Sequence, residues 1–462
     1  MFRPGNYRPG NLASIYRNDV APSPLLGNDP DTAVVSTVGH SLVDSRVDRD
    51  SNHLTKGVPD EHSAQGYLSP VARMPAQDAP GFRAIAFGPP QYSIPLKTGR
   101  DQKVVYILVP HNQSPMWEQV ASLFFVVSGE HPTLPKAELL SIIEGLEVPH
   151  RVTGNAYKLV IVEAKAGVGR VAAERAGFVE ECGVEIFHST ANYDAITESV
   201  KALQLDGYLN DEDSFSVRVS RFGEDADGVS RVKMESLVGG LLAQRTRAKV
   251  SLRNPEKLFR GILTGGDFHF GMLTYQRPKG SVARRRPRKR PAFHPSTMVP
   301  KLARCMVNLS HAKDGGVFLD PFCGIGGILI EAGMLGCRVV GMDALPRMVR
   351  GARRNLAHFG LEPLGLARAD ARRLPVREVD SIATDPPYGT GASTLKSTTR
   401  RILEDFLPRA RNVLRTGKRI VIASPVGTLG ALAEHNGFTV VDRHQVYVHS
   451  SLTREIQVMA AV

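Results

Sequence analysis

Four aspartates stand at the ends of predicted strands in the C-terminal part of the chain. They are Asp320, Asp343, Asp370 and Asp385. In an open sheet of parallel strands, ligands bind at the edge where the carboxyl ends of the strands meet. A single aspartate at such a place more often caps a helix or closes a turn. Four in the same register predict that the carboxylates converge on one ligand.

A glycine-rich turn follows the first of these aspartates. Residues 321–327 read Pro-Phe-Cys-Gly-Ile-Gly-Gly, and a predicted helix begins near Ile328. Gly324 and Gly326 allow a ligand to approach the backbone, which favours a nucleoside-type cofactor. A dinucleotide fingerprint would need a glycine three residues after Gly326, where Leu329 stands, so the pattern disfavours NAD. Cys323 has no base beside it in the sequence and is predicted to be a packing residue.

S-adenosylmethionine needs a carboxylate near its ammonium group, a glycine loop, a carboxylate for its ribose hydroxyls and a polar group near its adenine amine. Asp320, the two glycines, Asp343 and Asp370 supply these in chain order. His294 precedes a predicted helix over residues 298–309. It could contact the methionine part of the cofactor or only cap that helix.

Asp385-Pro386-Pro387-Tyr388 directly follows the predicted strand 381–384. The lone pair of an amino group on a base ring is delocalised, and two acceptors that take both N–H bonds favour its attack on a methyl donor. Asp385 can offer its carboxylate and Pro386 its carbonyl, while Pro387 makes the turn rigid and Tyr388 offers a flat face to an extruded base. Outside a folded context, Pro-Pro-Tyr could instead be a polyproline-type ligand. Directly after a strand, the segment predicts methylation of an exocyclic base nitrogen.

The elements that must position these residues alternate between strand and helix from residue 293 to residue 462, as in a doubly wound parallel sheet. The last two predicted strands, 445–449 and 455–460, are separated only by residues 450–454. That connection is too short for a crossover helix, so the last strand should be antiparallel. The fold class predicted for 293–462 is an α/β, Rossmann-like class I methyltransferase.

A chain of 462 residues is long enough for several domains. Residues 116–190 and 191–276 predict two small units that mix helices with strands. Residues 1–115 are rich in Pro, Gly, Asn, Asp and Ser and predict no stable fold, as a disordered extension or a start placed too far upstream.

Residues 277–292 form a basic, proline-interrupted tract that is predicted to be a linker. The net charge of +12 and the pI near 9.6 favour a partner that carries phosphate. The tract is therefore predicted to contact RNA, although a solvated linker would have the same composition. The residues concerned are Arg284, Arg285, Arg286, Arg288, Lys289 and Arg290.

The four cysteines are far apart and form no Cys-x-x-Cys pair, so neither a zinc site, nor any other metal site, nor a disulfide framework is predicted. This cysteine usage fits a reducing compartment. No apolar run is long enough for a membrane span, and the N-terminus lacks a secretory signal pattern. A cytoplasmic location without membrane contact is expected.

The sequence resembles the archaeal tRNA (guanine-10, N2) methyltransferases over residues 116–462. The resemblance rests on Phe293-His294-Pro295, on Asp320 to Gly324 and on Thr384 to Gly389. Residues 214–219, 235–239 and 250–255 resemble the THUMP domain of that family. It implies a ferredoxin-like domain (116–190), a THUMP domain (191–276) that engages the acceptor end of tRNA, a linker and the methyltransferase domain. It also implies transfer of methyl from S-adenosylmethionine to N2 of guanine 10.

Several points stay open at this level. Family members follow Pro-Pro-Tyr-Gly with Arg and small hydroxyl residues, whereas Thr390 to Thr394 stand here, so one or two methyl groups could be added. Guanine N2 at another tRNA or ribosomal position is an alternative, and some relatives need a small activating protein subunit. A DNA adenine methyltransferase also uses Asp-Pro-Pro-Tyr, and a non-catalytic RNA-binding protein could keep the fold alone.

Overall fold

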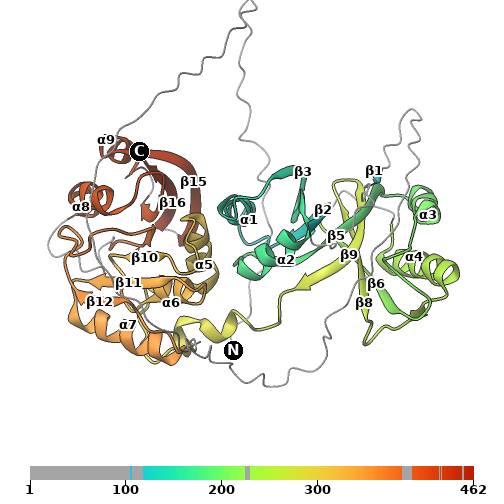
Figure 1. Ribbon diagram of the computed structural model, residues 1–462, viewed down its shortest axis with the longest axis horizontal. Coiled ribbons are helices and arrows are strands. Elements are labelled where there is room, and N and C mark those ends of the chain that lie inside the picture. The colour runs from blue at the N-terminus through green and yellow to red at the C-terminus, as the bar shows by residue number, and fades with distance from the viewer. Residues whose placement is uncertain are drawn as a thin grey trace, which may run out of the picture. The chain divides into compact units, whose positions relative to one another are not determined.

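The computed structural model describes residues 105–106, 118–223, 229–387, 398–425, 427, 429–449 and 452–462, which build two sheets (Figure 1). The prediction for residues 1–115 lies outside the described residues, apart from strand β1 (Val105–Tyr106), which pairs with β5 (Val179–Thr190). Tyr388 and residues 390–394 also lie outside them.

The first sheet has nine strands, in the order β3-β4-β2-β5-β9-β8-β6-β7 with β1 beside β5. The two small units predicted for 116–190 and 191–276 share this sheet, because β5 of the first unit pairs antiparallel with β9 of the second. We call the β5–β9 pair the sheet joint. The other strands are β2 (Val120–Val127), β3 (His150–Ala156), β4 (Leu159–Lys165), β6 (Ser214–Arg221), β7 (Lys249–Val250), β8 (Lys257–Thr264) and β9 (Asp267–Gln276).

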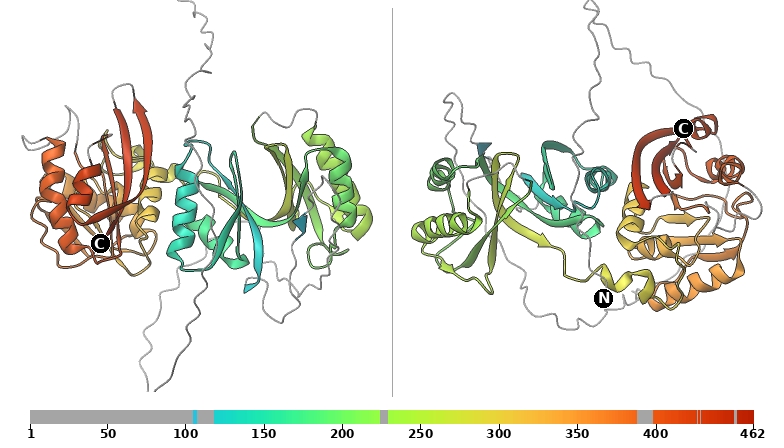
Figure 2. Two further views of the ribbon diagram at one scale, coloured as in Figure 1. Left: turned by 90° about the horizontal axis from the view of Figure 1, so that it is seen from above. Right: turned by 180° about the vertical axis from the view of Figure 1, so that it is seen from behind.

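Two pairs of helices cover the nine-stranded sheet (Figure 2). The first pair, α1 (Leu134–Gly145) and α2 (Ala166–Arg175), buries apolar side chains such as Leu139 against Leu123 and Phe125 of β2. The second pair, α3 (Tyr193–Ala202) and α4 (Arg231–Thr246), packs on a cluster that includes Phe215 and Phe259. The prediction missed α3, a short helix whose start Asn192 caps by accepting a hydrogen bond from Ala195 N. It also missed β3, whose residues are largely exposed.

The second sheet has seven strands, in the order β12-β11-β10-β13-β14-β16-β15. The first five are parallel, and β16 runs antiparallel to both β14 and β15, as predicted. The bounds are β10 (Val317–Asp320), β11 (Arg338–Asp343), β12 (Gly365–Arg368), β13 (Ser381–Thr384), β14 (Arg419–Pro425), β15 (Phe438–His449) and β16 (Leu452–Ala461). Strand β15 begins before the predicted residue 445, at the buried Phe438, and the prediction missed this first part, in which the exposed Asp442 and Arg443 interrupt the apolar residues.

Helices cover both faces of this sheet, as the alternation of side chains along its strands requires. Phe318 of β10 packs with α5 and α6, whereas the next residue, Leu319, packs with α8 and α9. The helices are α5 (Pro300–Leu309), α6 (Gly327–Gly333), α7 (Pro346–His358), α8 (Thr399–Val413) and α9 (Gly430–His435). The predicted Rossmann-like, doubly wound architecture is confirmed.

Glu138 of α1 connects the first sheet's helices to α5. The buried carboxylate accepts hydrogen bonds from the backbone N–H groups of Gly177 and Phe178, at 2.6 and 2.8 Å, and from Asn308 Nδ2 of α5 at 2.7 Å. Burial raises the pKa of Glu138, and these three donors oppose that shift.

Among the described residues no helix is long and apolar enough to cross a membrane.

Candidate active site

The carboxyl ends of four adjacent strands meet at one edge of the seven-stranded sheet. Strands β10 and β11 end at Asp320 and Asp343, and Asp385 directly follows β13. Asp370 comes two residues after β12. Pairing of β10 with β11 and β13, and of β11 with β12, keeps these ends side by side. The structure thus brings the four predicted aspartates to a common edge.

Asp320 is the most buried of these carboxylates, with 1% of its surface exposed. Its Oδ1 accepts hydrogen bonds from Thr384 Oγ1 at 2.6 Å and from Phe322 N at 3.2 Å. Burial raises the pKa of Asp320 to about 7, and the charges of Asp385 and Asp343 add to the shift. Within the part of the chain that the structure describes, no Lys or Arg forms an ion pair with Asp320. The site therefore favours a cationic ligand.

Asp343 connects the glycine loop to the end of β11. Its Oδ2 accepts a hydrogen bond from Gly324 N at 3.0 Å and its Oδ1 accepts one from Leu345 N at 2.9 Å. Burial raises the pKa of Asp343, and these two N–H donors oppose that effect. Each carboxylate oxygen keeps a further lone pair for a ligand.

The two predicted loop glycines have different roles in the structure. Both adopt left-handed backbone angles, with φ of +53° at Gly324 and +82° at Gly326. A Cβ at Gly326 would lie 3.3 Å from Ala352 Cα of α7, so this glycine permits close packing. A Cβ at Gly324 would meet no atom of a described residue within 4 Å. Gly324 therefore leaves open space beside Asp343, where a ligand could approach the backbone.

Asp370 and His294 have partners that the sequence did not reveal. Arg372 binds both oxygens of Asp370, with Nη2 at 2.6 Å from Oδ2, and lowers the pKa of Asp370. His294 Nδ1 lies 2.8 Å from Ser296 Oγ. The N-cap residue of α5 is Val299 and no side chain caps that helix, so the alternative that His294 caps it is wrong. His294 is near enough to Asp343 for its charge to oppose the rise that burial causes in the pKa of Asp343. Its contact with the methionine part of the cofactor stays a prediction.

The Asp385-Pro386-Pro387 segment is held from two sides. Thr399 Oγ1, at the start of α8, donates a hydrogen bond to the Pro387 carbonyl at 3.2 Å. On the other side, Arg454 Nη2 of β16 lies 3.4 Å from Asp385 Oδ2. Pro386 is buried, and the Asp385 side chain is 16% exposed.

Arg454 is a site residue that the sequence reasoning missed. Because β16 is antiparallel, its first residues lie at the carboxyl ends of the parallel strands, and Arg454 pairs with Pro425 at the end of β14. The prediction that the last strand is antiparallel contained this signal. Cys323, by contrast, is buried beside the loop, and burial raises the pKa of its thiol well above the ordinary value. Its side chain acts in packing, not as a nucleophile.

The basic tract divides into inward and outward side chains. Arg285 Nε donates to Glu331 Oε1 at 2.8 Å, and the buried Arg290 donates from Nε to the Arg285 carbonyl at 2.8 Å. Two short 3-10 turns, Ala283–Arg285 and Pro287–Lys289, produce this arrangement. The exposed members are Arg284, Arg286, Arg288 and Lys289. Within the described part of the chain, only these four exposed side chains of the predicted set are free of contacts that turn them inward, so the prediction of RNA contact now concerns them alone.

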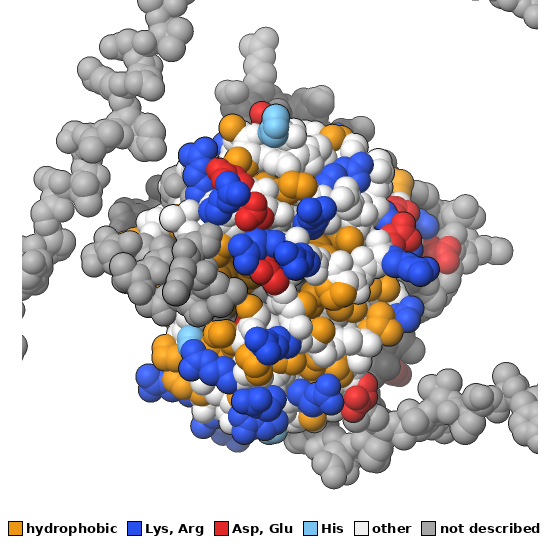
Figure 3. Space-filling view, turned by 90° about the vertical axis from the view of Figure 1, so that its left-hand side faces the viewer, with side chains coloured by type: hydrophobic (Ala, Val, Ile, Leu, Met, Phe, Trp, Pro, Cys, Tyr) orange, Lys and Arg blue, Asp and Glu red, His pale blue; other side chains and the backbone are white. Residues whose placement is uncertain are grey.

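Helix α7 carries a second set of exposed cations that the sequence reasoning did not single out. They are Arg347, Arg350, Arg353 and Arg354. Their spacing of three and four residues, which was visible in the sequence, places 347, 350 and 354 on one face of the helix. Figure 3 shows the side of the molecule on which α7 and α8 lie in Figure 1, with Lys and Arg side chains spread widely over it.

Comparisons with known proteins place this geometry in context. Residues 287–456 match the RMKL-like methyltransferase domain and residues 190–265 match the THUMP domain. The chain is 38% identical to the tRNA (guanine(10)-N2)-dimethyltransferase of Methanothermobacter thermautotrophicus, over 74% of this chain and 99% of that protein. It is 31% identical to the enzyme of the same name from Methanocaldococcus jannaschii, over 72% of this chain and 98% of that one. The crystal structure of TrmN from Thermus thermophilus aligns with a TM-score of 0.44 and 24% identity, over 74% of this chain and 100% of that one.

Proposed function

The chain belongs to the family of tRNA (guanine(10)-N2)-dimethyltransferases, and we propose that it transfers methyl groups from S-adenosylmethionine to N2 of guanine 10 in tRNA. The observation that carries this proposal is the position of Asp385-Pro386 directly after β13, at the same edge as the buried Asp320. A carboxylate and a carbonyl at that edge suit an exocyclic amine, which offers two N–H donors.

The cofactor proposal is supported by the charge and the open space at the strand edge. S-adenosylmethionine supplies a methyl group from its sulfonium and carries a cationic ammonium group. Asp320 would hold the ammonium, Asp343 would accept hydrogen bonds from the ribose hydroxyls, and Gly324 leaves open space beside it. Asp370 would contact the adenine amine with the lone pairs that Arg372 leaves. His294 would border the methionine part of the cofactor.

The ribose role of Asp343 can be measured directly. We expect Asp343→Ala to weaken cofactor binding by about 1 to 3 kcal/mol, because hydrogen bonds to a charged carboxylate are lost. Calorimetry on the folded variant provides the affinity, and circular dichroism checks that loss of the Gly324 and Leu345 hydrogen bonds has not unfolded the loop. An unchanged affinity would contradict this role.

The chemistry at the amine depends on the residues around Asp385. Asp385 Oδ and the Pro386 carbonyl would accept the two N–H bonds of guanine N2, so that its lone pair faces the methyl donor. Arg454 would keep the Asp385 carboxylate in place, and Thr399, which donates to the next carbonyl, that of Pro387, would hold the turn that carries the Pro386 carbonyl. The Asp385 carboxylate would take the proton that the amine loses. Pro387 would keep the turn rigid, and Tyr388 would stack on the extruded base.

The amine is held by fewer hydrogen bonds when the second methyl group is transferred. After one transfer only one N–H remains, so one of the two acceptors loses its partner. We therefore propose dimethylation with a slower second step.

The THUMP domain would bind the substrate by engaging the acceptor end of the tRNA. The exposed cations of the basic tract and of α7 would contact the tRNA backbone.

The test is mass spectrometry of nucleosides from unmodified tRNA incubated with the purified chain and labelled cofactor, mapped to position over time. A matched tRNA with inosine at position 10 lacks the exocyclic amine and should accept no label there. We expect N2-methylguanosine first and N2,N2-dimethylguanosine later, both at position 10.

Each alternative has its own outcome in this assay. Label on N2 of another guanine would show that the chain methylates a different tRNA position. Label on adenine in duplex DNA would support a DNA adenine methyltransferase. Cofactor binding without transfer until a cell extract is added would indicate an activating subunit. Neither binding nor transfer would support a non-catalytic RNA-binding protein.

A further inference from the structure

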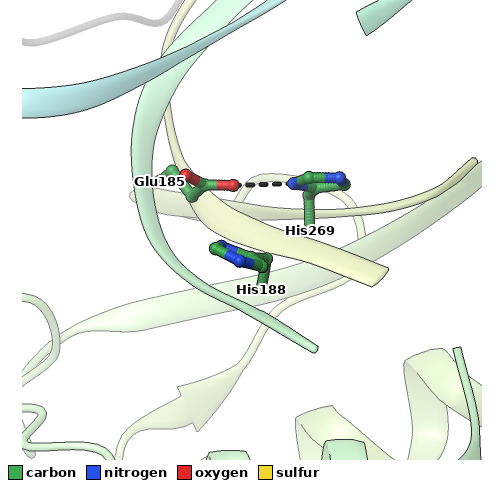
Figure 4. Close-up of side chains that lie close together, drawn as sticks. All are labelled: Glu185, His188 and His269. Atoms are coloured by element: carbon green, nitrogen blue, oxygen red, sulfur yellow. Dashed lines mark hydrogen bonds and ion pairs between the residues drawn. The ribbon is translucent and has the colours of Figure 1, made fainter. Parts of the chain in front are cut away.

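A second cluster of ionisable side chains lies in the nine-stranded sheet. Glu185 and His188 of β5 and His269 of β9 each offer one ligand atom, and these three atoms all lie within 4.8 Å of one another (Figure 4). Glu185 Oε1 and His269 Nδ1 are 2.7 Å apart. The cluster spans the sheet joint between β5 and β9. The proposed methyl transfer does not use it.

A β-bulge brings the three side chains together. In a regular antiparallel pair, Glu185 and Phe187 would point to one face and His188 to the other. Here the register shifts between Glu185 and Phe187, so that Glu185 pairs with Gly271 but His188 pairs with His269. The extra residue places His188 on the same face as Glu185, opposite His269. Bulges often reorient a side chain in this way next to functional sites.

The carboxylate of the cluster is oriented and charged. Ser122 Oγ of β2 donates to Glu185 Oε2 at 2.6 Å, which leaves Oε1 directed at His269. Burial acts to raise the pKa of Glu185, but the hydrogen bonds from His269 and Ser122 and the nearby imidazoles outweigh it, and the pKa is held below its ordinary value. Carboxylates that bind a metal are usually hydrogen-bonded by a neighbouring group in turn, as Glu185 is by Ser122.

His188 completes the set. Its ring lies 5.7 Å from the His269 ring, at an angle of 31°. Within the described ranges it makes no hydrogen bond, although it is only partly exposed and faces an anionic carboxylate. An imidazole nitrogen beside a carboxylate and a second imidazole is a donor set that binds divalent transition metals.

We propose that Glu185, His188 and His269 bind one divalent transition metal ion at the sheet joint, with Zn²⁺ as the best match. Two imidazole nitrogens and one carboxylate oxygen are ligands that zinc accepts in tetrahedral sites, and the partial exposure of both histidines leaves a fourth position for water. The ion would widen the Glu185–His269 contact to about 3.3 Å, the separation of two tetrahedral ligands at about 2.0 Å.

The ion would have a structural effect on the joint. Strands β3, β4, β2 and β5 lie on one side of the joint, and β9, β8, β6 and β7 lie on the other. Ligands from both β5 and β9 would connect the two halves of the sheet. Binding to the folded state alone would then stabilise it by mass action.

The experiment uses the full-length chain, free of any histidine tag and stripped with a chelator, titrated with Zn²⁺ and with Co²⁺ as a spectroscopic probe. We expect one ion per chain, visible d–d absorption from Co²⁺, and a melting temperature that rises with Zn²⁺.

His188→Gln is the decisive variant, since this side chain makes no hydrogen bond among the described residues and its loss should leave the metal-free fold intact. The matched control is His358→Gln, an exposed histidine at the end of α7. We expect at least tenfold weaker binding and no Zn²⁺-induced rise in melting temperature for His188→Gln, with wild-type behaviour for the control. Absence of stoichiometric binding, or wild-type affinity in His188→Gln, would overturn the proposal. Methyl transfer is not the readout, so this result is independent of the proposed activity.

Discussion

Glu331 and Asp320 are both buried carboxylates of the methyltransferase domain, and their surroundings differ in one respect. Glu331, on α6, receives Arg285 Nε and Arg304 Nε at 2.8 Å, one on each oxygen. Asp320, at the strand edge, receives only a hydroxyl and a backbone N–H from the part of the chain that the structure describes. A buried charge is costly unless it is paired. The paired carboxylate belongs to the framework, whereas the one without a cation marks the place where a cationic ligand would bind.

The largest effect should come from the edge carboxylate nearest the chemistry. We expect Asp385→Ala to reduce turnover by about 10²- to 10⁴-fold, because the amine loses the acceptor that orients and deprotonates it. Cofactor affinity should stay within a few-fold. The measurement is single-turnover methyl transfer to tRNA together with calorimetric cofactor binding.

The control for that variant is Asp380→Ala, which changes the aspartate at the opposite end of β13. Asp380 binds Arg415 and accepts a hydrogen bond from Val317 N at 2.8 Å, so its loss should affect stability and not turnover. Near-normal turnover in Asp385→Ala would remove that residue from the mechanism.

The second prediction compares how much each of the two buried carboxylates contributes to stability. Glu331→Ala should lower the free energy of unfolding by about 3–5 kcal/mol, because it leaves two arginines buried without their partner. Asp320→Asn should cost little stability near pH 8, because it removes an ionised group that lacks a cation. Urea unfolding of both variants provides the comparison. A larger loss of unfolding free energy in Asp320→Asn than in Glu331→Ala would contradict the contrast between the two carboxylates.

The third prediction concerns pH. The pKa of Asp320 is about 7, and a bound ammonium group would favour its ionised form. Cofactor affinity should therefore rise by up to roughly tenfold per pH unit below about 7 and level off above it. Because the folded-state pKa is raised, the stability that Asp320 contributes without cofactor is present below about pH 4 and lost as the pH rises through about 7.

Calorimetry at several pH values, in buffers of different ionisation enthalpy, should detect about half a proton released on cofactor binding at pH 7, rising towards one proton at about pH 6. Asp320→Asn should bind more weakly and without this pH dependence. A pH-independent affinity in the unmodified chain would show that the strand edge does not select a cation in this way.

The smallest expected effect is on tRNA affinity, and it should differ between the exposed and the inward-facing arginines of the basic tract. Replacing Arg284 and Arg286 with Ala should flatten the slope of log tRNA affinity against log salt by up to about 2 units, through the release of fewer counterions. Arg285→Ala should leave most of that slope and lower the melting temperature, because Glu331 would keep only one of its two arginine partners, Arg304. Cofactor binding should be unchanged in the double variant. Equal salt slopes in the double variant and the unmodified chain would assign the exposed arginines to the linker role.

Much of the strand edge could be predicted from the sequence because its signals are local. Strand runs that end in an aspartate, the turn with Gly324 and Gly326, and Asp385-Pro386 after β13 all lie within short segments of the chain. The brief connection between β15 and β16 was enough to predict the antiparallel last strand.

Other features depended on contacts between distant residues, which no local pattern specifies. The pairing of β5 with β9 joins the two small units, and a one-residue bulge in β5 decides that His188 faces Glu185. The same basic tract sends Arg285 inward to Glu331 and leaves Arg286 exposed, although the two are neighbours of one type. The sequence by itself determined which side chains can carry the chemistry and which faces their strands bury. Only the tertiary structure decided which cation meets which carboxylate, because that depends on strand pairing and packing across the whole chain.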